Sequence, residues 1–149
     1  MPPYGDDHNN NYNNNYNNNY NNNKKYNSRI MVLDDDFDIA TIVKMTLQRY
    51  GFRKVSMFTD PSIAIREFRE NDDDYSLVVS DIRMPGINGF EFAHYINKIS
   101  PGIKVILMTA FNIHEDLLTL QSEYDAHNVT RIIQKPISPK KLAKIVSAL

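Results

Sequence analysis

Acidic side chains stand directly after two apolar segments of this chain. Asp34 and Asp35 follow residues 30–33, and Asp81 follows residues 76–80. An apolar run of this length between turn residues is typical of a strand buried on both faces of a parallel sheet. Open α/β sheets bind ligands outside the carboxyl ends of their strands. The three carboxylates are therefore candidates for one binding site, although Asp81 taken alone is also consistent with an aspartate that caps the next helix.

Three carboxylates brought close together repel one another, which raises the pKa of at least one of them. A divalent cation relieves this repulsion. Hard oxygen ligands, few in number and with room for water, suit Mg²⁺. The sequence therefore predicts a magnesium site at Asp34, Asp35 and Asp81. Asp38, one helical turn further on, is interpreted as a solvated acid in the first turn of a helix.

Two other apolar segments also end in polar residues. Thr109 follows residues 103–108, and Lys135 follows residues 131–134. Taken singly, these are an ordinary strand-end threonine and a surface lysine. Beside the carboxylates they match the needs of phosphoryl transfer, in which positioned cations and hydroxyl donors stabilise charge on the equatorial oxygens. The combination predicts phosphoryl chemistry on one carboxylate.

Apolar segments alternate with amphipathic ones along the chain, which predicts an α/β fold. The expected strands are 30–33, 54–58, 76–80, 103–108 and 131–134. Helices are expected between Asp36 and Gly51, from Pro61 to a loop at 71–74, and at 90–99, 114–126 and 138–148. This alternation indicates a five-stranded parallel sheet with helices on both faces, in the order 2-1-3-4-5.

The order 3-2-1-4-5 is the main alternative, because it is usual for dinucleotide-binding domains. Those domains carry a glycine-rich turn after the first strand. Here three consecutive aspartates, residues 34–36, occupy that position and would repel a pyrophosphate. A dinucleotide-binding function is excluded on this ground.

The first part of the chain differs in composition from the rest. Residues 9–27 contain thirteen asparagines, with Tyr12, Tyr16 and Tyr20 spaced by asparagine triplets. Such a tract cannot bury enough apolar surface to offset the entropy of ordering. We therefore predict a disordered tail at 1–27 and one domain at 28–149.

Composition excludes several classes of function. The 149 residues include no cysteine, so no disulfide or thiol chemistry is expected, and the net charge of −1 gives no reason to expect nucleic-acid binding. No segment has the pattern of a membrane span or signal peptide, which favours the cytoplasm. No effector segment follows the last expected helix, so we expect a stand-alone domain or a fragment.

Five short motifs occur together in a set order. They are Asp34-Asp35, Asp81 with Met84-Pro85-Gly86, Asn88-Gly89, Thr109-Ala110 and Lys135-Pro136. In order and spacing they resemble the receiver domain of two-component response regulators, over about residues 30–149. The resemblance implies the flavodoxin-like receiver fold. It also implies a phosphoacceptor that promotes its own phosphorylation and hydrolysis, without turnover of an outside substrate.

Roles for individual residues follow from the resemblance alone. It implies that Asp81 accepts a phosphoryl group from a phosphohistidine on a sensor histidine kinase. Mg²⁺ would be bound by Asp34, Asp35, Asp81 and the backbone carbonyl of Arg83. Thr109 and Lys135 would contact the phosphoryl group, and the bond before Pro136 would be cis. A downstream protein target is also expected, although the sequence does not identify it, and the resemblance leaves a phosphorylation-dependent dimer open.

Two positions depart from the family pattern. Ile132 stands where the family usually has a tyrosine or phenylalanine that acts as a switch, and residues 126–129 replace the usual Gly-Ala. Isoleucine is β-branched and has little χ1 freedom, so it cannot make the same swing. We therefore expect activation to be relayed elsewhere, through the loop 110–113 with Phe111 as its candidate.

Two rival interpretations use the same residues. A Mg²⁺-dependent phosphatase of the haloacid dehalogenase type would make Asp34 the nucleophile and Asp36 the acid. That class needs further carboxylates after the lysine, and no aspartate or glutamate follows Asp125. An interaction module with an inactive site is the other alternative, but every residue that phosphorylation needs is present.

Overall fold

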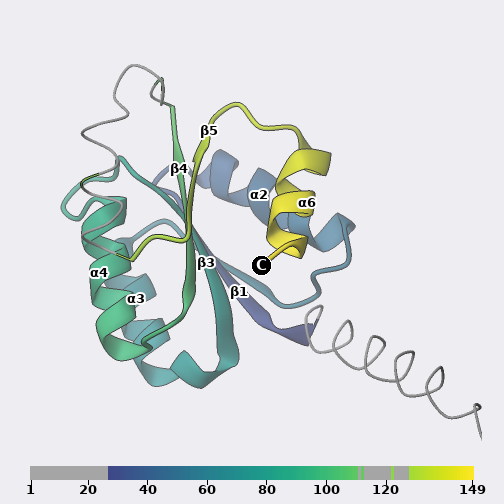
Figure 1. Cartoon of the computed structure of the whole chain (residues 1–149). Coiled ribbons are helices and arrows are strands. Elements are labelled where there is room, and N and C mark those ends of the chain that lie inside the picture. The colour runs from purple at the N-terminus through teal and green to yellow at the C-terminus, as the bar shows by residue number, and fades with distance from the viewer. Residues whose placement is uncertain (1–26, 111, 113–121, 123–127) are drawn as a thin grey trace, which may run out of the picture.

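The computed structural model describes residues 27–110, 112, 122 and 128–149. The strands are β1 (Arg29–Leu33), β2 (Val55–Phe58), β3 (Tyr75–Asp81), β4 (Lys104–Thr109) and β5 (Arg131–Gln134). All neighbouring strands are parallel, and their order is β2-β1-β3-β4-β5. The predicted fold class and strand order are confirmed (Figure 1).

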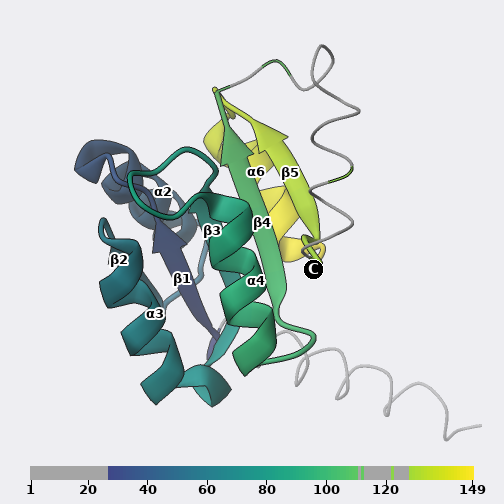
Figure 2. The ribbon, with the colours of Figure 1, turned by 90° about the vertical axis from the view of Figure 1, so that its left-hand side faces the viewer.

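Helices cover both faces of this sheet. The described helices are α2 (Phe37–Arg49), α3 (Pro61–Glu70), α4 (Gly89–Ile99) and α6 (Pro139–Ser147). Figures 1 and 2 show α2 and α6 on one face, and α3 and α4 on the other. Each face has its own apolar core, one built with Leu47 and Leu142 and the other with Phe68 and Phe92. Among the described residues, no helix is both long and apolar enough to cross a membrane.

The strand register brings the polar strand ends together. Leu33 of β1 pairs with Ser80 of β3, so the residues that follow them lie at the same level of the sheet. Asp81 in turn pairs with Met108 of β4, and Thr109 pairs with Gln134 of β5. Because parallel strands all end at one edge, the acids, the threonine and the residue after β5 share that edge.

Side-chain caps begin the helices that leave this edge. The carboxylate of Asp36 accepts from the N–H groups of Asp38 and Ile39, and Asp60 caps α3 in the same way. Asn88 and Glu91 form a capping box at the start of α4. These caps satisfy N–H groups that have no partner within the helix, and they fix where each helix starts relative to the strand before it.

The structure corrects several details of the sequence prediction. Residues Asp72–Asp74 form a short 3-10 helix rather than a loop. The helical spacing of Ile42 and Tyr50 predicts that both lie on the buried face of α2, but both are exposed, and Ala40 occupies the core instead. Leu149 shares helical spacing with Leu142 and Val146, which predicts a common buried face, but Leu149 lies beyond α6 and is exposed. Apart from single residues, the predicted helix 114–126 and tail 1–27 lie outside the described part of the chain.

Candidate functional site

Asp34 is held by backbone contacts on both sides. Its N–H donates to the carbonyl of Phe58 at 3.2 Å, which continues the pairing of β1 with β2. Its Oδ1 accepts from the N–H of Asp36 at 3.0 Å. The residue is only 5% exposed, so its carboxylate is oriented by the backbone and largely shielded from bulk solvent.

Asp81 is the last residue of β3 rather than the first residue after it. The chain beyond it stays attached to the sheet because the N–H of Ile82 donates to Met108 at 2.9 Å. The N–H of Gly89 then donates to the carbonyl of Ile82 at 2.8 Å, which brings the start of α4 back against the strand end. Asp81 is 8% exposed, and these backbone hydrogen bonds hold the end of its strand against β4 and the start of α4.

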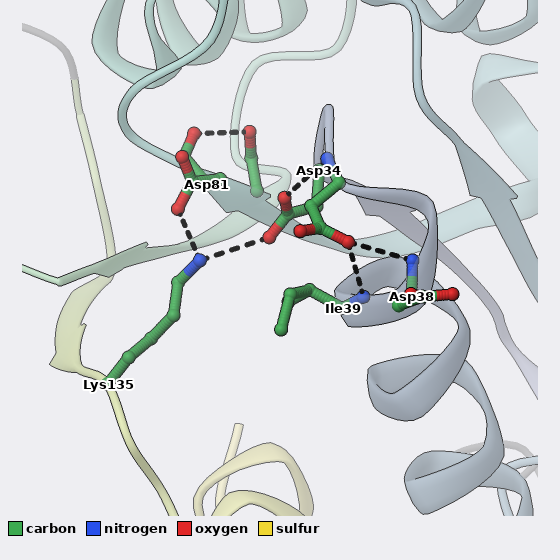
Figure 3. Close-up of polar contacts among 7 residues, drawn as sticks. Asp34, Asp38, Ile39, Asp81 and Lys135 are labelled. Carbon is green, nitrogen blue, oxygen red and sulfur yellow. Dashed lines mark hydrogen bonds and ion pairs between the residues drawn. The ribbon is translucent and has the colours of Figure 1, made fainter.

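Lys135 reaches across the sheet edge to both of these acids. Its Nζ lies 2.6 Å from Oδ1 of Asp81 and 3.1 Å from Oδ2 of Asp34 (Figure 3). Its backbone N–H donates to the carbonyl of Thr109 at 2.7 Å, which extends the pairing of β4 with β5. The peptide bond to Pro136 is cis. One ammonium group thus bridges carboxylates that come from two different strands.

Burial and ion pairing act in opposite directions on the pKa values of Asp34 and Lys135, and the pKa of each group is raised as a result. Burial raises the pKa of the Asp34 carboxyl above its usual value, although the N–H of Asp36 and the ammonium of Lys135 act against it. Burial also lowers the pKa of Lys135, but its hydrogen bonds to Asp81 and Asp34 outweigh that effect and leave the pKa raised. The lysine is therefore a cation at neutral pH, whereas ionisation of Asp34 lowers the stability of the folded state.

The three carboxylates predicted to bind the metal lie together. Carboxylate oxygens of Asp34, Asp35 and Asp81 all lie within 4.8 Å of one another, with Asp35 exposed and the other two buried. They border a cavity of about 380 Å³ at the sheet edge. Its lining consists of Asp34, Asp35, Asp36, Ile39, Asp81, Arg83, Thr109, Ala110 and Lys135. The space is large enough for a small anion together with a hydrated cation.

Most residues singled out from the sequence meet at this cavity. Thr109 is 2% exposed and lines it beside Lys135. Asp38 is exposed and is not among the lining residues, in keeping with its interpretation as a solvated acid. Ile132 is partly buried and packs against the core between the sheet and α3 and α4. Phe111 lies outside the described residues.

Sequence reasoning missed two lining residues. The sequence marks Asp36 only as the start of a helix and, in the phosphatase alternative, as the acid, whereas in the structure it both caps α2 and borders the cavity. The helical spacing of Ile39 predicts that it lies on the buried face of α2, but it also lines the cavity. Ile39 lies three residues after the cap, and the first turn of a helix that follows a strand lies beside the end of that strand. This position is the signal that could have placed Ile39 at the cavity.

Comparison with known proteins agrees with this geometry. Residues 30–147 match the family described as the response regulator receiver domain. The chain belongs to this family. The match covers the strands β2 to β5, all of β1 except Arg29, and the four described helices. It gives no support to the haloacid dehalogenase alternative.

Curated relatives of this receiver domain differ in length. The response regulator receiver protein CpdR of Brucella abortus is 26% identical over 81% of this chain and 95% of its own length. The DNA-binding response regulator MtrA of Mycobacterium tuberculosis is 32% identical over 80% of this chain, but only 49% of MtrA is covered. For the two-component response regulator ARR14 of Arabidopsis thaliana, 29% identity extends over 78% of this chain and 29% of the relative. The chain thus spans about half of MtrA and less than a third of ARR14.

Solved structures share the fold of this receiver domain. The chemotaxis protein CheY4 of Vibrio cholerae superposes with a TM-score of 0.72 at 24% identity, covering 81% of this chain and 97% of CheY4. The BeF3-activated receiver domain of DrrB superposes with a TM-score of 0.66 at 26% identity, covering 81% of this chain and 95% of that domain. The fold of this receiver domain therefore matches nearly the whole of CheY4 and nearly the whole of the DrrB domain.

The raised pKa of Asp34 predicts a pH-dependent cost to stability in this receiver domain. The folded state holds the proton more tightly than the unfolded state, so stability should fall as pH rises through the ordinary carboxyl pKa toward the raised value. An asparagine amide carries no charge, so metal-free Asp34→Asn should be more stable than the unchanged protein at neutral pH, by on the order of 1 kcal/mol. Urea denaturation without metal measures this difference.

Two further measurements complete this test. The stability difference should disappear near pH 3, about one unit below the ordinary carboxyl pKa, because the carboxyl is then neutral in both states. Added Mg²⁺ should stabilise the unchanged protein and leave Asp34→Asn nearly unaffected. A variant that is less stable than the unchanged protein at neutral pH without metal would contradict the inferred cost of burying this carboxylate.

Proposed function

We propose that this receiver domain takes a phosphoryl group from a phosphohistidine of a sensor histidine kinase onto Asp81. The observation that carries the proposal is the contact of Lys135 with both Asp81 and Asp34 at the border of an acidic cavity. Such a cation stabilises the negative charge that builds up on the transferred group. Response regulator receiver domains work with sensor histidine kinases, which agrees with this choice of donor.

The reaction assigns a task to each side chain. A carboxylate oxygen of Asp81 attacks the phosphorus, and the bond from phosphorus to the imidazole nitrogen breaks with its electron pair leaving on the nitrogen. Lys135 already holds Oδ1 of Asp81 at 2.6 Å, which leaves the other carboxylate oxygen as the proposed nucleophile. The ammonium of Lys135 then balances negative charge on the oxygens of the transferred group. The hydroxyl of Thr109 donates a hydrogen bond to one of these oxygens. No outside substrate is turned over.

The acidic residues fit a bound magnesium ion. Three carboxylates gather within 4.8 Å of one another, and one ammonium group cannot balance all of their charge. Oxygen donors of this kind suit Mg²⁺. Asp34, Asp35, Asp81 and the backbone carbonyl of Arg83 are the proposed ligands, since Arg83 also lines the cavity. When bound, the ion would supply positive charge beside the phosphoryl oxygens.

Phosphorylation by a small donor tests this function directly. With Mg²⁺ and acetyl phosphate, the intact mass of the protein should increase by one phosphate per chain. Chelation of the metal with EDTA should prevent that increase. A small phosphate ester such as p-nitrophenyl phosphate should not be turned over. Failure to take up phosphate under these conditions, or equal uptake with Mg²⁺ and with EDTA, would contradict the proposal.

We also propose that residues 28–149 form the phosphorylated unit and that residues 1–27 form a separate tail. The family match begins at residue 30, close to this boundary. Removal of residues 1–27 is expected to shift the melting temperature by less than about 2 °C, because unstructured termini contribute few contacts. A loss of many degrees would show that these residues pack on the domain. A cytoplasmic location and a downstream protein target complete the proposal.

A further inference from the structure

The phosphorylation cavity has one apolar wall of substantial size. Most of its described lining residues carry charged or polar side chains, whereas Ile39 and Ala110 carry apolar ones. Alanine contributes only a methyl group. Ile39 is therefore the one large side chain of this lining that cannot hydrogen-bond to water.

Ile39 is held firmly in place. Its backbone N–H donates to Oδ1 of Asp36 at 3.1 Å, which fixes it in the capped first turn of α2. Its side chain also packs against the core between the sheet and α2 and α6. A β-branched side chain in a helix has essentially one χ1 rotamer. The apolar wall is therefore rigid.

The wall stands beside the bridging lysine. Figure 3 shows the Ile39 side chain extending from α2 toward Lys135, next to the contacts of that lysine with Asp34 and Asp81. An apolar side chain here offers no hydrogen bond to a water molecule on this flank of the ion pair. Exclusion of water strengthens charge interactions within a site and suppresses hydrolysis of reactive groups.

We propose that Ile39 sets the lifetime of phosphorylated Asp81 by denying water a hydrogen-bonding position on the Lys135 side of the cavity. This inference rests on the proposed phosphorylation of Asp81. On this proposal, Ile39 shapes the cavity and affects the rate at which Asp81 loses the phosphoryl group. The rate at which Asp81 takes up the phosphoryl group is largely unchanged.

The reaction that Ile39 limits is hydrolysis of the acyl phosphate. A water oxygen forms a bond to phosphorus, and the bond from phosphorus to the Asp81 oxygen breaks with its electron pair returning to the carboxylate. The protons of the water remain on the released phosphate or pass to solvent. Asp81 carboxylate and inorganic phosphate are the products, so no further reactant is needed. A hydroxyl in place of a methyl group of Ile39 could hold such a water.

A pair of variants with the same shape isolates this effect. Ile39→Val and Ile39→Thr both shorten the side chain, and they differ only in a methyl group against a hydroxyl. Each protein is phosphorylated with acetyl phosphate and Mg²⁺, separated from the donor by desalting, and followed by intact mass as phosphate is lost. Ile39→Thr should lose phosphate roughly two- to tenfold faster than Ile39→Val, the factor that one hydrogen bond to the attacking water contributes.

Controls separate this effect from general disruption. Ile42 is 57% exposed on the same helix and does not line the cavity, so Ile42→Thr should leave the lifetime unchanged. If Ile39→Thr melts well below Ile39→Val, Ile39→Gln provides a polar group with better helix propensity. If phosphorylated Asp81 has the same lifetime in the polar variants as in Ile39→Val, the inference about Ile39 is wrong, although the proposed phosphorylation is unaffected. Absence of phosphate uptake by the unchanged protein would instead overturn the proposed function, and this inference with it.

Discussion

Replacement of Asp81 by asparagine is expected to reduce phosphate uptake from acetyl phosphate by at least about a hundredfold. The amide retains the size of the carboxylate, but it carries no negative charge and is a poor nucleophile. The contact of Lys135 with Oδ1 at 2.6 Å can be kept by the amide oxygen, so the fold should survive the change. Intact mass after incubation with Mg²⁺ and the donor measures the loss.

Asp38→Asn is the matched control for this substitution. Asp38 is an exposed acid in the first turn of α2, at the same edge of the sheet, and it does not line the cavity. The control should take up phosphate as the unchanged protein does. If Asp81→Asn were still labelled with one phosphate per chain, Asp81 could not be the acceptor.

Gly89→Ala adds a single methyl group next to the site. We expect it to destabilise the protein more than any other added methyl group there. A Cβ on Gly89 would lie 2.4 Å from the carbonyl oxygen of Asp81 and 2.9 Å from Cα of Ile82. Both obstacles are backbone atoms, so no side chain can move aside to make room. We expect Gly89→Ala to cost about 3 kcal/mol in the free energy of unfolding, at the upper end of overpacking.

The same substitution should also impair phosphorylation, because α4 and the end of β3 must separate to admit the methyl group. Gly102→Ala is the control. Gly102 has a φ of +92°, and an added Cβ would meet nothing within 4 Å. It should cost only about 1–2 kcal/mol, the penalty for a left-handed conformation, and leave phosphate uptake intact. Urea denaturation compares the two variants, and equal losses would contradict the close approach inferred at Gly89.

Much of this fold could be predicted because its signals are local. Asp36 and Asp60 follow strands and cap the next helices, as their types and positions suggest. Apolar runs marked the strands, with β3 ending at the acid that the sequence singled out. Right-handed crossovers then leave few arrangements. Because parallel strands end at one edge, the sequence alone places Asp34, Asp81 and Lys135 together, and the contacts of Lys135 with both acids agree.

The exposed face of α2 shows where sequence reasoning failed. Ile42 and Tyr50 share helical spacing with buried positions, yet both are exposed and Ala40 lies in the core. Periodicity counts apolar residues, but it cannot tell a small residue that packs closely from a large one left in water. Ile39 illustrates the same limit, because its contact with the cavity depends on how the first turn of α2 meets the end of the strands. The contact between Gly89 and the Asp81 carbonyl likewise depends on tertiary packing.

Chemical trapping of the phosphorylated protein tests the central claim most directly. Sodium borohydride reduces an aspartyl phosphate to homoserine, a permanent change that peptide mass spectrometry can locate. After treatment with acetyl phosphate and Mg²⁺, homoserine should be found at position 81 and should be absent at Asp34 and Asp35, which share the cavity. Homoserine at either of those positions, or phosphate retained on a serine or threonine with Asp81 unchanged, would contradict the account.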